Sequence, residues 1–160
     1  MDGKQFQRTE DGHLILMSAD ERNLLITDLT ARINYGVICL IERVDDFGPI
    51  RRNEKLTGFC FDDIGGFHFE VGGGLDIVFA EKIMPYLRPM SSMTEEELKE
   101  FSYTILQQPD LDAVRNWQTI SIDLKELSKV LDWLNKHHFD YRGLIPMGLA
   151  ISAPEGMYKI

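Results

Sequence analysis

The most reactive group of side chains in the sequence lies in one short stretch, residues 135–142. It contains two imidazoles, a carboxylate, a phenol and a guanidinium, from His137, His138, Asp140, Tyr141 and Arg142. These residue types can supply a general base, the acid that orients it and a clamp for an anion. The enzymatic hypothesis is therefore a hydrolase or nuclease that uses His137, His138 and Asp140 with an acquired metal.

The same stretch also suits the end of a helix, and we favour this structural interpretation. Adjacent histidines on a helix point about 100° apart and do not readily share one metal. His138 continues the spacing of the leucines before it, which predicts that its ring packs inward with one nitrogen hydrogen-bonded. His137 suits a helix end because the helix dipole favours positive groups there. We expect His137 to be the more exposed of the two.

No other motif predicts a metal, a cofactor or a nucleophile. The histidines are scattered, and the sequence lacks His-x-x-x-His and Cys-x-x-Cys spacings. Cys39 lies in an apolar run, where a cysteine behaves as a small hydrophobic residue, and Cys60 has no basic neighbour in sequence. The glycine triplet 72–74 lacks the lysine and the helix of a phosphate loop. We expect turns at this triplet and at the acidic pair 62–63.

The chain is acidic, with 26 acidic and 17 basic residues and a net charge of −9. Phosphate binding needs clustered Lys and Arg, so this balance argues against direct binding to nucleic acid. Residues 61–100 hold nine acidic and three basic residues. This concentration indicates either solvated surface or an acidic docking face for a protein partner. The partner-binding residues of such a face are Glu95, Glu96 and Glu97.

Residues 83–93 combine two prolines with three methionines. Prolines stiffen a segment, and methionines offer adaptable apolar surface. We expect a loop here, which either covers the core or binds a partner. In the second case Tyr86, Arg88 and Met90 join the partner-binding residues.

Three amphipathic segments predict helices near 19–34, 94–107 and 123–138. Ser18 with Glu21, and Thr94 with Glu97, match the capping box that begins many helices. The four leucines of the third segment keep steps of three and four residues.

Between the first two helices, apolar or alternating segments separated by turn residues predict an antiparallel sheet over about 37–79. The expected strands lie near 37–41, 54–61, 67–71 and 75–79. Alternation in the third strand points Phe67, Phe69 and Val71 inward and His68 to the opposite face. The fold class is α+β, a single compact domain over 1–160 in which this sheet packs with three main helices. Residues 1–12 are expected to form a flexible N-terminal segment.

No apolar run reaches the roughly 18 residues of a membrane span. The polar start of the chain, residues 1–13, lacks the apolar core of a secretion signal. We therefore expect a cytoplasmic protein with no membrane contact. The sequence predicts no particular oligomeric state.

Several segments resemble a family of short uncharacterised proteins encoded by phages, prophages and mobile elements of gut Bacteroides. The resemblance lies in residues 35–39, 85–97, 132–145, 148–150 and 153–158. These segments, together with an early helix before them, are distributed along most of the chain. The resemblance implies a bacterial or phage cytoplasmic setting and an accessory role, and it assigns no catalytic residues.

The function we expect is a small non-enzymatic interaction protein, in which the acidic region 61–100 and the segment 83–93 form the docking surface. The metal-dependent hydrolase or nuclease described above is one alternative. A structural or virion-associated protein is the other. A pocket with converging catalytic groups would favour the enzyme, and a large exposed apolar patch would favour the structural role.

Overall fold

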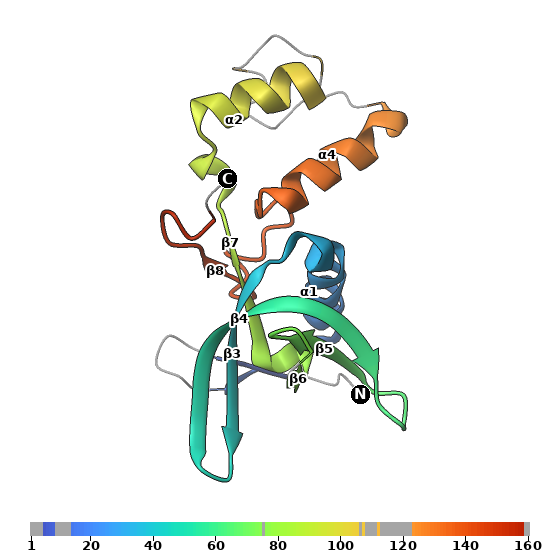
Figure 1. Ribbon diagram of the computed structural model, residues 1–160, viewed down its shortest axis with the longest axis vertical. Coiled ribbons are helices and arrows are strands. Elements are labelled where there is room, and N and C mark those ends of the chain that lie inside the picture. Colours follow the sequence, from blue (N-terminus) through green and yellow to red (C-terminus); the bar gives the residue numbers. More distant parts are fainter. Residues whose placement is uncertain are drawn as a thin grey trace.

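A mixed sheet of six strands lies at the centre of the fold, in the order β6-β5-β4-β3-β7-β8 (Figure 1). The computed structural model describes residues 5–8, 14–74, 76–105, 107, 112 and 123–158. The strands of this sheet are β3 (Ile38–Asp45), β4 (Gly48–Phe61), β5 (Phe67–Val71), β6 (Asp76–Val78), β7 (Ile83–Leu87) and β8 (Ile151–Ser152). A separate antiparallel pair is formed by β1 (Gln5–Arg8) and β2 (Leu14–Met17).

The helices lie in two places (Figure 1). Beside the sheet lies α1 (Ala19–Arg32), and α2 (Glu95–Glu100) and α4 (Leu124–Lys136) lie together at one end of the molecule. A π-helical turn, η4 (Phe101–Ile105), continues α2. Short 3-10 turns are η1 (Ile33–Tyr35), η2 (Ala80–Lys82) and η3 (Met90–Ser92). Within the described ranges, every helix is too short or too polar to cross a membrane.

The α+β fold class and the three predicted helices are confirmed. Ser18 and Thr94 cap α1 and α2 in complete capping boxes. The third helix is predicted two residues too long, because α4 ends at Lys136 and His138 has a φ of 59°. That left-handed backbone conformation cannot continue a right-handed helix. Of the flexible segment expected over 1–12, only Gln5–Arg8 lie within the described residues, where they form β1.

The antiparallel meander predicted over 37–79 is confirmed, since β3 to β6 pair in chain order. One strand is longer than expected. β4 begins at Gly48 rather than near residue 54, because its first eight residues pair with the whole of β3, from Asp45 opposite Gly48 to Ile38 opposite Lys55.

The loop predicted over 83–93 is wrong in its first half, which forms β7. This strand pairs antiparallel with β3 and parallel with β8, so the sheet is mixed. Proline has no amide hydrogen to donate to a neighbouring strand. Pro85 is tolerated because the backbone groups of successive residues point alternately to the two neighbours of the strand. Leu87 accepts a hydrogen bond from the Ala153 amide on the β8 side, so Pro85 faces that side too. There β8 pairs only with Tyr86 and Leu87.

Two clusters of buried side chains stabilise the fold. The first lies between α1, one face of the sheet and residues 144–150, and it includes Leu25, Leu29, Ile41 and Phe69. The second lies between α2, η4 and α4 and includes Leu98, Phe101, Val130, Trp133, Leu134 and Phe139. Burial of such side chains contributes roughly 1.5–3 kcal/mol each.

Arg32, at the end of α1, connects the two clusters. Its Nε and Nη2 donate to the carboxylate of Asp28 over 2.7 and 2.9 Å, and both side chains are fully buried. Nη2 also donates to the Phe139 carbonyl at 2.8 Å. Because the Phe139 ring belongs to the second cluster, this buried guanidinium attaches α1 to the segment that follows α4.

Replacing Arg32 with methionine should lower the free energy of unfolding by about 3–5 kcal/mol, because it leaves the Asp28 carboxylate buried without its main partner. Arg22→Met is the matched control on the same helix, since Arg22 pairs with Glu81 where both side chains are partly exposed. Its loss should be about 1 kcal/mol or less. Urea unfolding of both variants tests this, and equal losses would contradict the role given to Arg32.

Candidate functional site

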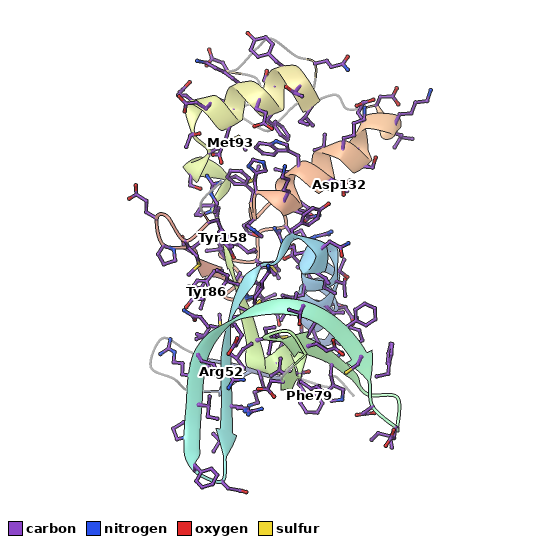
Figure 2. All side chains as sticks on the ribbon, in the orientation of Figure 1. Arg52, Phe79, Tyr86, Met93, Asp132 and Tyr158 are labelled. Carbon is purple, nitrogen blue, oxygen red and sulfur yellow. The ribbon has the colours of Figure 1, made fainter. Side chains whose placement is uncertain are left out.

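An open groove of about 700 Å³ lies between the start of α2 and the segment 152–158. We call it the acidic groove, because carboxylates from two separate parts of the chain line it: Glu96, Glu97, Glu100 and Glu155. Arg88 and His137 also line it, with Pro89, Pro154 and Gly156. Figure 2 labels Tyr158, one of the residues that line the groove, below α2.

The capping box of α2 places Glu97 in this groove. Thr94 Oγ1 accepts a hydrogen bond from the Glu97 amide, and the Thr94 amide donates to Glu97 Oε2 at 2.8 Å. The carboxylate held in this way accepts two hydrogen bonds from Arg88, at 2.6 and 2.8 Å. Burial alone would raise the pKa of Glu97, but Arg88 and the Thr94 amide outweigh it and lower the pKa to about 2. The pair is thus charged and neutralised internally at neutral pH.

His137 is more buried than the sequence predicts. Its ring stacks on Trp133 with centroids 4.0 Å apart, and only 3% of the residue is exposed, against 5% for His138. The expected difference in exposure is wrong, because Trp133 lies one helical turn earlier and covers the ring. His137 Nδ1 lies 3.6 Å from Glu97 Oε1, beyond hydrogen-bond distance. Burial lowers the pKa of His137, although Glu97 and Glu100 oppose the shift.

His138 packs inward as predicted, but its Nδ1 has no hydrogen-bond partner among the described residues. Its ring stacks on Tyr158 with centroids 3.8 Å apart. Burial lowers the pKa of His138 to about 3, and the positive charges of Arg32, Arg88 and Lys55 add to this effect. The imidazole is therefore neutral at pH 7.

The other predicted catalytic residues have separate structural partners. Asp140 accepts hydrogen bonds from the amides of Leu144 and Ile145, at 2.7 and 2.8 Å, and so fixes the following turn. Tyr141 donates its hydroxyl to Asn135 Oδ1 at 3.1 Å. Arg142 lies 3.3 Å from Asp28. Of the five candidates, His137 alone lines the acidic groove.

The structure does not assemble the ligands of a metal ion in the part of the chain that it describes. No group of three or more His, Cys, Asp or Glu side chains there is arranged to hold one. Asp62 instead forms the predicted turn, accepting from the amides of Ile64 and Gly66, and it contacts His68 Nε2 at 2.7 Å.

The predicted partner-binding residues divide into two groups. Arg88, Glu96 and Glu97 line the acidic groove. Tyr86, Met90 and Glu95 do not: Tyr86 belongs to β7, Met90 packs against the cluster around Phe101, and Glu95 is exposed on α2.

Tyr158 is a central residue that the sequence reasoning missed. Its hydroxyl accepts a hydrogen bond from the Ile38 amide at 3.0 Å and donates one to the Tyr86 carbonyl at 2.8 Å (Figure 2). The register of β3 and β7 pairs Cys39 with Pro85, so Ile38 and Tyr86 form the next rung. At this rung the hydroxyl replaces the direct backbone bond, and the two strands diverge around it. No local sequence signal indicates this long-range contact.

The exposed phenylalanines on the hairpin of β4 and β5 are another feature that the sequence does not predict. Phe59 and Phe61 are 49% and 64% exposed. Both contact the ring of Phe67, with centroids 5.4 and 5.5 Å away.

Phe69 and Val71 are buried as predicted, whereas His68 is buried on the opposite face because Phe79 lies against its ring.

Acidification should destabilise the protein through His138. A group whose pKa falls from 6.5 to about 3 on folding binds its proton more readily in the unfolded chain, so stability falls as the pH drops below 6.5. Through His138 alone, the free energy of unfolding should fall by about 2 kcal/mol between pH 7 and pH 5. His138→Asn removes this pH dependence while suiting the left-handed backbone. Urea unfolding at both pH values should show a smaller acid loss in the variant, and identical losses would refute the assignment.

The chain matches no protein-family model, no curated protein and no solved structure in comparisons with each.

Proposed function

We propose that this chain is a non-enzymatic accessory protein that binds an extended, lysine- or arginine-rich segment of a protein partner in the acidic groove. The observation that carries the proposal is the charge of the groove. Glu96 and Glu155 are exposed on opposite walls, while Arg88 already pairs with Glu97. The remaining carboxylates favour a cationic occupant.

The shape of the groove supports an extended segment. It is open to solvent, and prolines stiffen both walls, Pro89 on one and Pro154 on the other. Walls that are already ordered reduce the entropy lost on binding. A flexible basic segment could lie along them with its side chains directed to the carboxylates.

A role without catalysis is supported by the separate tasks of the predicted catalytic residues. Asp140 holds a turn, Tyr141 bonds to Asn135, and Arg142 lies beside Asp28. A general base needs its partner within hydrogen-bond reach, and these side chains do not converge. The resemblance to phage and mobile-element proteins supports an accessory role in the cytoplasm.

The exposed phenylalanines favour a second candidate function, assembly in a structural or virion-associated role. Phe59 and Phe61 extend the buried face of the sheet into solvent, beside the half-buried ring of Phe67. Contiguous exposed aromatic surface is a common feature of protein interfaces.

Binding in the acidic groove can be tested with a labelled 12-residue peptide of alternating lysine and serine. Fluorescence anisotropy at low salt should detect binding that weakens as salt is added. The double variant Glu96→Gln/Glu155→Gln should weaken binding at least tenfold. Glu97 is left intact because it caps α2 and holds Arg88.

The matched control is Asp46→Asn/Asp63→Asn, which removes the same charge from exposed turns outside the groove. It should bind the peptide nearly as well as the wild type. Equal weakening in both double variants would show that only the overall charge matters, and it would contradict a specific groove.

Sedimentation velocity at tens of micromolar separates the two candidate functions. The groove-binding role predicts a monomer. The assembly role predicts an oligomer that dissociates in Phe59→Ser/Phe61→Ser, because the substitutions remove exposed aromatic area without reaching the buried Phe69. An oligomer that persists in this variant would contradict assembly through the phenylalanines.

A further inference from the structure

We propose that a second groove, on the other side of His137 and Tyr158, binds a small molecule carrying an oxyanion, a phosphate or a carboxylate. This basic groove has a volume of about 730 Å³. Its lining includes Tyr35, Gly36, Lys55, Lys136 and His138. The inference goes beyond the proposed function, because it concerns a different cavity and a ligand of opposite charge.

The groove lies at the start of β3, where the Tyr158 hydroxyl bridges β3 and β7. Tyr158 holds the two strands apart at Ile38, and both residues line the cavity. Next to them the chain leaves η1 through Gly36, with a φ of 66°. A side chain at Gly36 would collide with the end of the Lys55 side chain, so the glycine lets Lys55 lie directly over the backbone at this edge of the groove.

Two lysines on opposite elements supply the positive charge. Lys55 comes from β4 and Lys136 from the last turn of α4, and both side chains are exposed. Glu54 also lines the groove, but its carboxylate pairs with Arg52 at 3.1 Å. A lysine ammonium binds phosphate or carboxylate as a compact point charge.

His138 supplies an unused hydrogen-bonding group. Only 5% of the residue is exposed, and it lines the groove. Its Nδ1 has no hydrogen-bond partner among the described residues. Buried polar atoms are nearly always hydrogen-bonded, so an orphaned ring nitrogen at a cavity points to an absent partner. Burial is the main cause of the low pKa of His138, and Lys55 is among the positive charges that add to it.

The dimensions and the side walls suit a small organic anion. Ligand cavities for such molecules span about 300–1,000 Å³. Tyr35 and Tyr158 contribute aromatic rings, and Tyr35 is held in place by its hydrogen bond to Asp132 at 3.2 Å. A planar group attached to the oxyanion could pack against these rings.

Isothermal titration calorimetry at low ionic strength with inorganic phosphate, phenyl phosphate and benzoate tests the proposal. Phenyl phosphate should bind more tightly than inorganic phosphate if the rings contribute. Binding of both phosphates but not benzoate assigns the site to phosphate, and preference for benzoate assigns it to carboxylate. The double variant Lys55→Gln/Lys136→Gln should weaken binding at least tenfold while its melting temperature stays close to that of the wild type.

The control is Lys125→Gln/Lys129→Gln, which removes two charges from α4 outside the groove and should leave affinity unchanged. Nitrogen NMR of the histidine rings gives a second measurement, in which the ligand should shift the His138 resonances. The proposal is overturned if none of the three probes binds at millimolar concentration, or if both lysine pairs matter equally. Such a failure would not contradict peptide binding in the acidic groove, because that proposal is tested with a different ligand and different variants.

Discussion

The buried ion pair between Asp28 and Arg32 is the contact on which the arrangement of the molecule depends. Arg32 belongs to the helix that packs on the sheet, and its guanidinium reaches the carbonyl of Phe139, whose ring lies among the other helices. A charge buried at this depth is costly unless it is paired. Nε and Nη2 of Arg32 bond to the Asp28 carboxylate and the Phe139 carbonyl, whereas Nη1 has no hydrogen-bond partner among the described residues. The segment around Phe139 is therefore held in one position, and the Arg88 backbone fixes it from the other side by bonds to His138 and Asp140.

This fixed segment explains why the two grooves lie back to back. The rings of His137 and His138 project from neighbouring positions, one stacked on Trp133 and the other on Tyr158. His137 and Tyr158 line both cavities. One cavity is lined with carboxylates and the other with lysines, so a thin aromatic wall separates surfaces of opposite charge. The chain's overall acidity conceals this local difference.

Features with local causes could be predicted from the sequence, and features with distant causes could not. The capping boxes of Ser18 and Thr94 and the meander before η2 follow from neighbouring residues. β7 looked like a loop because the prolines and methionines of residues 83–93 dominate the local pattern, and pairing on both sides overrides that tendency. Likewise, Arg88 and the acidic start of α2, on one wall of the acidic groove, could be predicted as binding residues. The opposite wall could not, because it comes from residues 152–158, which are distant in the sequence.

The Tyr158 hydroxyl makes the junction of β3 and β7, inside the sheet, depend on a contact between residues that are 120 positions apart, since it replaces a backbone bond between these strands. Closing so long a loop costs entropy before any contact repays it. This rung of the sheet should therefore form late in folding, after the local meander. In the native state it should also open early. Hydrogen exchange of the Ile38 amide would thus report on the docking of residues 153–158 rather than on the stability of the strand to which Ile38 belongs.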